Sequence, residues 1–178
     1  MKTLKKLGIG ILIVIAIPLI VALFVPKDFT YEKSIKINAP IDSVWIYTSS
    51  LSGLDKWSPW NDYDPAMKKV WTGVDGTVGA KQSWESDVEN VGVGSQTIVN
   101  IQAPNLFETD LHFIKPFESK SNAYVKLVDD NGVTDATWGF SGSMPYPFNL
   151  MNLFMDMEKD MGKDWDNGLA KLKKLAEE

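Results

Sequence analysis

The chain has 178 residues, of which 44% are hydrophobic and 11% aromatic, enough for one globular domain with a short appendage. It contains no cysteine, which excludes thiol catalysis, disulfide bonds and thiolate zinc sites. All 18 basic residues are lysines and the net charge is −5, so the composition argues against partners such as nucleic acids or phosphates, which arginine binds best.

The N-terminal segment has the pattern of a membrane anchor. Lys2, Lys5 and Lys6 precede an uncharged run, Leu7–Val25, that ends at Pro26-Lys27. Nineteen helical residues span roughly 28 Å, about the thickness of the hydrocarbon core of a bilayer. A cleaved signal peptide is the alternative, although the run ends without a small-residue cleavage site. We therefore predict an anchor within residues 1–26 and a separate domain over residues 27–178.

The lysines before this run predict the topology. By the positive-inside rule the N-terminus is cytoplasmic, and residues 27–178 lie on the exported side, either periplasmic or extracellular. Without those three lysines the domain has 18 − 3 = 15 lysines against all 23 acidic residues, a net charge of −8. Because such a surface avoids anionic headgroups, we expect the domain to be tethered near the membrane rather than embedded in it.

A strand and two short helices follow. Apolar and polar residues alternate from Phe29 to Ile37, which is typical of a strand. Asn38-Ala39-Pro40 ends that strand and predicts a helix through Val44–Tyr47, with Asn38 as its capping residue. Ser52–Leu54 and Trp57–Trp60 indicate a second short helix that breaks into a loop.

The middle of the chain predicts a meander of six short strands. Gly73, Gly76 and Gly79 indicate a turn rather than a phosphate-binding loop, because no helix or Lys-Ser/Thr pair follows them. Asp129–Gly132 is a strong hairpin signal. Without intervening helices, these strands predict an antiparallel sheet. The six ranges are Lys69–Thr72, Ala80–Glu85, Ser95–Ile101, Leu106–Phe113, Ser119–Val128 and Val133–Phe140.

The last stretch, Pro147–Glu178, predicts one long amphipathic helix. At helical spacing its apolar stripe consists of Leu150, Phe154, Met157, Met161, Trp165, Leu169 and Leu172. The acidic residues at positions 156, 160 and 164 alternate with lysines, which favours a solvated, self-paired face over a cation site. We expect the stripe to pack on the sheet.

This order of elements resembles the START/birch-pollen-allergen superfamily (SRPBCC). The resemblance rests on the boundary Ile35–Trp45, the Trp57-Ser58-Pro59-Trp60 element and the terminal helix, and it covers residues 28–178. It is closest to the polyketide cyclase/dehydrase and lipid-transport branch with an N-terminal membrane anchor. It implies an α+β helix-grip fold, in which a seven-stranded antiparallel curved sheet wraps around the C-terminal helix, with a transmembrane helix before it.

The same resemblance implies an apolar cavity between the sheet and the helix. A plain packed core is the alternative, because most aromatic stripes belong to cores. With a cavity, the protein binds or carries a small hydrophobic ligand, such as a lipid or polyketide, and the membrane is its second partner. The predicted ligand-binding residues are Trp57, Trp60, Trp84, Phe107, Leu111, Phe113, Trp138, Phe154, Met157 and Met161.

Catalysis receives little support from the sequence. The one histidine, His112, falls on the polar face of its strand, and no nucleophile elbow or metal-ligand cluster is present. Glu85, Asp135, Tyr124 and Tyr146 are the titratable residues near apolar faces, and none is a convincing general acid or base. We predict no catalytic residue, metal or cofactor. A polyketide cyclase or dehydratase remains the main alternative, and an interaction domain without a cavity is a third.

Overall fold

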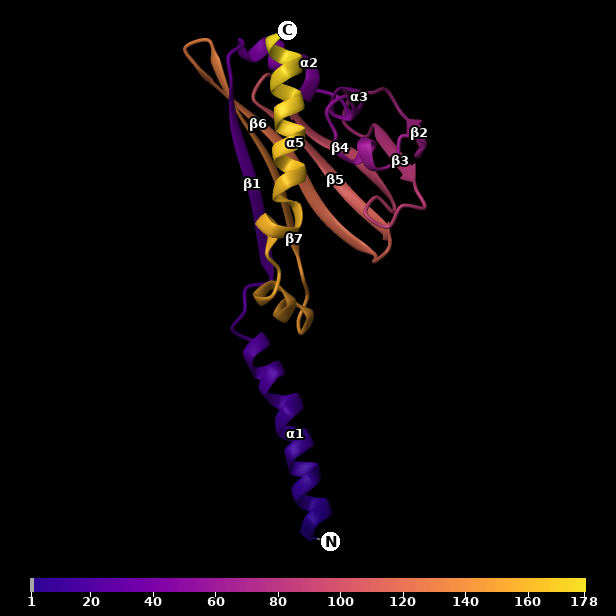
Figure 1. Cartoon of the computed structure of the whole chain (residues 1–178), viewed down its shortest axis with the longest axis vertical. Coiled ribbons are helices and arrows are strands. Elements are labelled where there is room, and N and C mark those ends of the chain that lie inside the picture. Colours follow the sequence, from indigo (N-terminus) through magenta and orange to yellow (C-terminus); the bar gives the residue numbers. More distant parts are fainter. Residues whose placement is uncertain (1) are drawn as a thin grey trace. The chain divides into compact units, whose positions relative to one another are not determined.

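The computed structural model describes residues 2–178, apart from the side chains of residues 2–5, 7–9, 11 and 13 (Figure 1). The chain forms two compact units. One contains the residues up to Phe29 together with Gly142–Asp156, and the other contains Thr30–Ser141 and Met157–Glu178. Because the boundaries fall inside strands β1 (Asp28–Ile37) and β7 (Val133–Ser143), each unit is built from segments far apart in the sequence.

The first unit contains helix α1 (Lys2–Ala22) and a 3-10 helix, η1 (Phe148–Leu153). The predicted span Leu7–Val25 includes five positions whose side chains lie outside the described residues. Within the described part of the chain, no helix is long and apolar enough to cross a membrane. The membrane anchor and the domain boundary at residue 26 therefore stay predictions.

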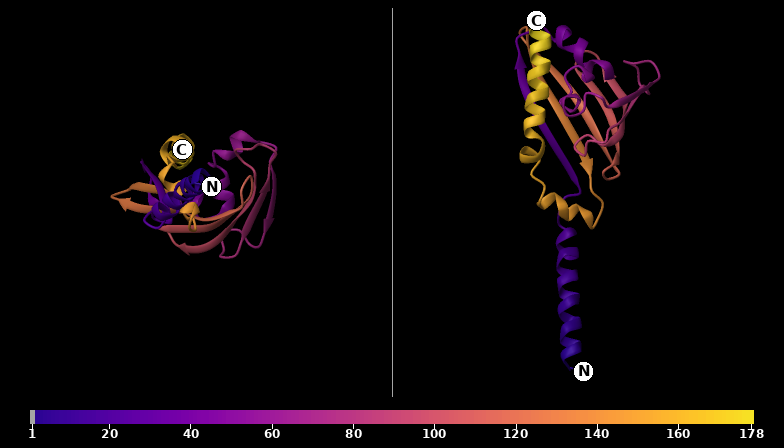
Figure 2. Two further views of the ribbon diagram at one scale, coloured as in Figure 1. Left: turned by 90° about the horizontal axis from the view of Figure 1, so that it is seen from below. Right: turned by 45° about the vertical axis from the view of Figure 1, so that its right-hand side comes forward.

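The second unit is organised around a seven-stranded antiparallel sheet, as predicted. The strands lie in the order β1-β7-β6-β5-β4-β3-β2. Figure 2 shows that the sheet is curved, with helix α5 (Met157–Glu177, yellow) on its concave side. The strands are β1 (Asp28–Ile37), β2 (Lys68–Thr72), β3 (Lys81–Glu85), β4 (Val93–Gln102), β5 (Leu106–Lys115), β6 (Ser119–Asp130) and β7 (Val133–Ser143).

Two glycine-containing turns match their sequence signals. Asn131 and Gly132 both adopt positive φ, of 55° and 89°, as the tight turn between β6 and β7 requires. Gly73, Gly76 and Gly79 also have positive φ, between 78° and 91°, in the connection from β2 to β3. They are therefore turn glycines, which confirms the prediction made for them.

Three short helices lie between β1 and β2: α2 (Ile41–Thr48), α3 (Leu51–Asp55) and α4 (Trp60–Tyr63). The prediction that Asn38 caps α2 is wrong. The helix begins after Pro40 without a side-chain cap, and the Asn38 N–H donates to Glu177 at 2.6 Å instead. This bond ties the end of β1 to the last turn of α5.

The C-terminal stretch is not one continuous helix. The 3-10 segment η1 ends at Leu153, and α5 covers Met157–Glu177. The interruption has a tertiary cause, since the amides of Asn149 and Asn152 bond to backbone carbonyls of residues 22–27, which holds η1 in the first unit. In α5, Trp165, Leu169 and Leu172 are buried, as the apolar stripe predicts.

One end of the sheet carries a conventional hydrophobic core. Phe107 is 1% exposed and packs with Leu51, Ala80 and Ile98, and Trp45 adds to the cluster. Helices α2 and α3 supply part of this cluster, so the inward face of β5 near its start is already filled. Further along β5, Leu111 and Phe113 face an open space instead.

Candidate functional site

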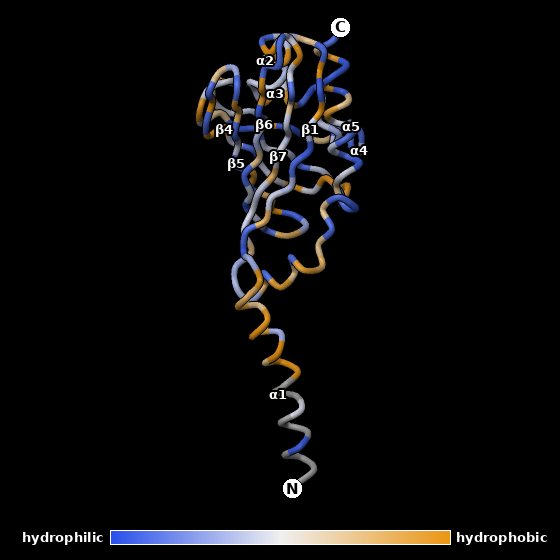
Figure 3. Tube along the Cα trace, turned by 90° about the vertical axis from the view of Figure 1, so that its left-hand side faces the viewer, coloured by the Kyte–Doolittle hydropathy of each residue, from blue (hydrophilic) through white to orange (hydrophobic). Residues whose placement is uncertain are grey.

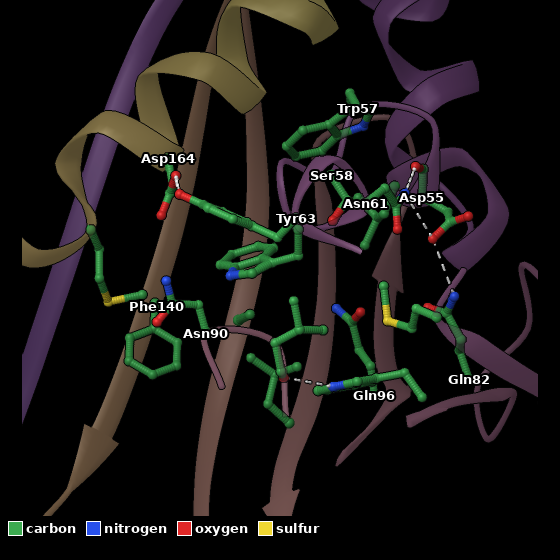
Figure 4. A pocket seen from close by; sticks show the side chains of 18 of the residues that line it. Asp55, Trp57, Ser58, Asn61, Tyr63, Gln82, Asn90, Gln96, Phe140 and Asp164 are labelled. Carbon is green, nitrogen blue, oxygen red and sulfur yellow. Dashed lines mark hydrogen bonds between the residues drawn. The ribbon is translucent and has the colours of Figure 1, made fainter. Parts of the chain in front are cut away.

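A cavity of about 430 Å³ lies within the second unit (Figure 4). Its walls come from β2 to β7, from the loops around α3 and α4, and from the first turns of α5. The volume falls within the range of about 300–1,000 Å³ that is common for small-molecule sites. The sheet and the helix are thus held apart over part of their length rather than fully interdigitated.

Four tryptophans form the aromatic wall of the cavity. Trp138 from β7 stacks on Trp165 from α5, with ring centroids 4.4 Å apart and an interplanar angle of 18°. Trp57 and Trp60 meet Trp138 edge-on at 4.8 and 5.7 Å. The indole N–H groups of Trp57 and Trp165 donate to backbone carbonyls. With these polar atoms satisfied, the wall offers apolar ring surface to the cavity.

Two glycines allow the tryptophans to approach the backbone closely. A Cβ atom on Gly168 would lie 2.8 Å from the Trp138 ring, and a Cβ atom on Gly94 would lie 2.6 Å from the Trp84 ring. Trp84 also packs edge-on against Phe113 at 5.9 Å. Larger residues at positions 94 and 168 would force these rings to move.

A polar cluster occupies one side of the cavity. Lys69 Nζ donates to Asp55 Oδ1 and to Asn61 Oδ1, both at 2.7 Å, and Gln82 Nε2 donates to Asp55 Oδ1 at 3.3 Å. The side chains of Asp55 and Lys69 are only 28% and 21% exposed. In Figure 4, Asp55 and Gln82 lie across the cavity from Asp164 and Phe140. The cavity therefore has a polar side, where the single positive charge of its lining is already paired.

Two glutamines extend this polar side along the sheet. Gln82 and Gln96 are direct cross-strand partners on β3 and β4, and both line the cavity. Gln96 Nε2 donates to the hydroxyl of Thr109 at 2.8 Å, and this hydroxyl donates to the carbonyl of Ala123 at 3.3 Å. These bonds fix the orientation of the Gln96 amide, so its carbonyl oxygen is available as an acceptor.

The opposite side of the cavity is acidic. Asp160 and Asp164 from α5 belong to the lining, and the hydroxyl of Tyr63 donates to Asp164 Oδ1 at 2.8 Å. This hydrogen bond, together with desolvation, raises the pKa of Tyr63, which therefore remains protonated. Asp160 is exposed, as the prediction of a solvated face requires, and Asp164 is half-buried, but both also line the cavity. The cavity lies along the edge of the apolar stripe of α5, so the acidic residues next to the stripe line the cavity as well.

The structure gathers most of the predicted ligand-binding residues around this cavity. Seven of them line it: Trp57, Trp60, Trp84, Leu111, Phe113, Trp138 and Met161. Phe107 is used in the core instead, Phe154 is 82% exposed in the first unit, and Met157 is the first residue of α5 and is not part of the lining. Whether the seven bind a ligand stays a prediction.

Sequence reasoning missed the polar side completely. Asp55 belongs to the segment interpreted as a short helix that breaks into a loop, and Lys69 belongs to a short strand. Gln82 and Gln96 gave no periodic signal. Strand parity could have placed both glutamines on the same face of the sheet as Trp84. Gln82 precedes Trp84 by two residues, and Gln96 is the cross-strand partner of Gln82. The four residues named as titratable near apolar faces, Glu85, Asp135, Tyr124 and Tyr146, are not in the lining.

His112 and the acidic residues offer no metal chemistry in the described chain. His112 pairs with Glu118 at 3.1 Å on the surface. Among the residues that the structure describes, no group of three or more histidine, cysteine, aspartate or glutamate side chains could hold a metal ion.

The curved sheet, the long C-terminal helix and the cavity between them define the helix-grip class of proteins. Residues 28–177 match the family model described as polyketide cyclase / dehydrase and lipid transport. The chain belongs to this family, as its sequence motifs led us to expect. A search of curated proteins finds no sequence match.

Solved structures share the fold at low sequence identity. A protein from Nitrosospira multiformis is 18% identical, with a TM-score of 0.59 over 82% of this chain and 94% of its own. Ara h 8.0201 is 13% identical, with a TM-score of 0.55 over 84% and 95%. The di-domain ARO/CYC protein StfQ from the steffimycin biosynthetic pathway is 8% identical, with a TM-score of 0.61 over 85% of this chain and 51% of its own. At these identities the similarity establishes the fold alone.

Proposed function

We propose that this protein binds or carries a small, neutral and largely apolar ligand in the cavity described above. The observation that carries the proposal is the cavity itself, about 430 Å³ lined by five tryptophans of the second unit together with Leu111 and Phe113. Burying apolar ligand surface contributes about 25 cal/mol per Å², so an apolar wall alone can supply useful affinity. Membership of a family named for polyketide cyclases and lipid transport supports this proposal.

The polar and acidic sides of the cavity refine the expected ligand. The ammonium group of Lys69 is already bound by Asp55 and Asn61, so it offers little to a carboxylate. Asp160 and Asp164 would repel an anion. A neutral molecule with an apolar body and a hydroxyl or carbonyl group fits both sides best.

We further propose that α1 anchors the protein in a membrane, with the N-terminus cytoplasmic and the ligand-binding domain on the exported side. The support is the apolar run Leu7–Val25 after three lysines. In the described part of α1 the apolar side chains also lack a covering partner, with Leu12, Val14 and Ile15 between 58% and 71% exposed. Such exposure is costly in water and ordinary in lipid.

Equilibrium dialysis of 2-naphthol against the full chain in phospholipid nanodiscs tests the binding proposal. Empty nanodiscs give the background partitioning. We expect saturable uptake of one molecule per chain, which Leu111→Trp should weaken about tenfold or more by filling the cavity, an effect worth roughly 1.4 kcal/mol. Ile114→Trp on the same strand, at a half-exposed position, is the matched control. Equal uptake by both variants would contradict the proposal.

A cyclase or dehydratase is the second candidate, because ionisable groups do lie in the cavity. The cluster of Asp55, Lys69 and Asn61 could hold or move a proton on a bound ketone. The test is incubation with a soluble poly-β-keto thioester. An enzyme would form aromatic product faster than buffer does, and Asp55→Asn would remove the acceleration while Asp62→Asn would keep it. Product formation at the buffer rate would rule this activity out for that substrate class.

A further inference from the structure

The last turn of α1 is completed by side chains from a distant segment of the same unit. Leu19 O accepts a hydrogen bond from the hydroxyl of Tyr146 at 3.3 Å, and Ala22 O accepts one from Asn149 Nδ2 at 2.7 Å. The two carbonyls between them bond to the N–H groups of Leu23 and Phe24. All four carbonyls that a helix normally leaves open at its C-terminus therefore have protein partners.

The chain that follows α1 is satisfied in the same way. Val25 O accepts from Asn149 Nδ2 at 2.7 Å, and Asn152 Nδ2 donates to Pro26 O and Lys27 O at 3.1 and 3.3 Å. The Met144 N–H also donates to Lys27 O, at 2.9 Å. Asn149 is fully buried. Two asparagines thus replace the water molecules that would hydrate the end of an exposed helix.

The outer surface of this polar framework is apolar. No charged residue occurs between Asp135 and Asp156, so the whole of η1 and its flanks is uncharged. Figure 3 shows hydrophobic colours over the described C-terminal part of α1. We call the exposed apolar residues here the collar: Leu23 (67% exposed), Phe24 (82%), Phe148 (64%), Met151 (56%), Leu153 (56%) and Phe154 (82%).

These two features are hard to reconcile with contact to bulk water. Water would hydrate open carbonyls without help, and soluble surfaces rarely expose a contiguous group of large apolar side chains. At the edge of the hydrocarbon of a bilayer both features are favourable, since backbone groups there must be satisfied internally and the apolar face of an interfacial helix carries Phe and Leu. Leu23 and Phe24 of the collar directly follow α1, whose side chains Leu19, Ile20 and Val21 are exposed too.

We propose that the collar inserts into the boundary between headgroups and acyl chains of a phospholipid bilayer. The inference rests on the proposed anchoring by α1 and adds a second contact, in which η1 holds the protein against the membrane surface. A helix lying in this layer buries its apolar face by about 5–10 Å. Because the collar is uncharged, this contact is compatible with the acidic surface of the domain.

The absence of cysteine makes a depth measurement straightforward. Phe154→Cys carries a nitroxide label on the full chain in phosphatidylcholine vesicles, and its collisions with oxygen and with a water-soluble nickel complex are compared by power saturation. Phe117→Cys, in the turn between β5 and β6, is the matched control because Phe117 is 81% exposed. Ile15→Cys reports on α1 itself. We expect high oxygen-to-nickel ratios at positions 15 and 154, and a ratio severalfold lower at position 117.

The possible results distinguish insertion of the collar from anchoring by α1. A shielded label at position 15 with a water-exposed label at position 154 would overturn the collar and leave the anchor intact. Water-exposed labels at both positions would overturn both proposals. Shielding at position 154 that disappears when the chain is diluted into excess lipid would mean that a second copy covers the collar, which also overturns the inference. A label at Leu153→Cys repeats the measurement at a neighbouring site.

Discussion

At the scale of single residues, Gly168 determines how closely α5 approaches the aromatic wall. We predict that Gly168→Ala lowers the free energy of unfolding by about 1–3 kcal/mol, because its new Cβ would overlap Trp138, which is stacked on Trp165. Asn167→Ala is the control in the same helix, at the exposed position beside Gly168. Denaturant titration of both variants measures the difference. An equal loss would show that the Trp138 approach is not the constraint.

Asp75 stabilises the start of the helix that carries Asp55 of the polar cluster. Its carboxylate accepts the N–H groups of Leu51, Ser52 and Gly76 at 2.8–3.0 Å. It thus supplements the Ser50 cap at the start of α3, the helix that ends at Asp55. Desolvation acts to raise the pKa of Asp75, but hydrogen bonds from Ser52, Leu51 and Gly76 outweigh it and hold the pKa below its usual value.

We predict that Asp75→Ala costs about 0.5–2 kcal/mol of stability at neutral pH, as the loss of a cap does elsewhere. Because the folded-state pKa is depressed, this contribution is complete above the ordinary aspartate pKa and is lost as the pH falls through the lower folded value. The gap between variant and wild type in urea unfolding should therefore narrow at acidic pH. A gap that is constant down to pH 2 would contradict the role assigned to this carboxylate.

The residues also show why the sequence predicted one half of the site and not the other. Trp84, Leu111 and Trp138 follow strand parity, so a single sequence places them on the inward face. Asp55 and Lys69 meet only because α3 folds back over β2, a contact between segments whose hydrophobic pattern is weak. No local signal encodes such a pairing.

At the scale of elements, β3 and β4 together set the polar side of the cavity. We predict that Gln96→Leu lowers the preference for 2-naphthol over naphthalene about fivefold, corresponding to one hydrogen bond of roughly 1 kcal/mol. The test is competitive equilibrium dialysis with the full chain. Gln102→Leu, at the exposed end of β4, should leave the preference unchanged. An unchanged preference in Gln96→Leu would remove the glutamine pair from ligand recognition.

The first turns of α5 are held on β1 by a polar latch. Lys33 Nζ lies 2.9 Å from Glu158 and 2.7 Å from Asp166, and the Tyr31 hydroxyl donates to Glu158 at 2.5 Å. These hydrogen bonds lower the pKa of Glu158, while desolvation and the bond to Glu158 raise the pKa of Tyr31 to about 12. At neutral pH Glu158 therefore stays ionised and the Tyr31 hydroxyl stays protonated, as their hydrogen bond requires.

We predict that Lys33→Met speeds amide hydrogen exchange in residues 158–166 and leaves residues 169–175 protected, since Leu169 and Leu172 stay buried. Lys36→Met is the control, because Lys36 pairs with Asp130 in an exposed site on the same strand. Uniform exchange along α5 in the Lys33 variant would mean that the helix opens as a single unit.

Element order and sheet topology were predictable, whereas the interruption of the terminal helix was not. Strand alternation and turn residues are local signals, and the seven strands follow them closely. The residue types at positions 147–157 are compatible with a helix. However, Asn149 and Asn152 form hydrogen bonds with residues 22–27, and a helical pattern in the sequence does not reveal such distant contacts. Tertiary hydrogen bonds overrode a local preference there.

At the scale of the whole molecule, charge selects among ligands. The net charge is −5, and Asp55, Asp160 and Asp164 all line the cavity. We predict that 2-naphthoate binds more weakly than 2-naphthol, and that the difference shrinks in Asp164→Asn and at high salt. Parallel dialysis at low and high salt measures this. Tighter binding of the carboxylate would show that Lys69 is free to pair with it.

The central claim is that the space between the sheet and α5 holds a ligand. Anomalous diffraction from crystals of the full chain grown with 6-bromo-2-naphthol tests it most directly. We expect the bromine peak inside the cavity, among Trp84, Leu111 and Trp138, with Gln82 or Gln96 bonded to the hydroxyl. A cavity closed by side chains, with bromine found only at the surface, would contradict the claim.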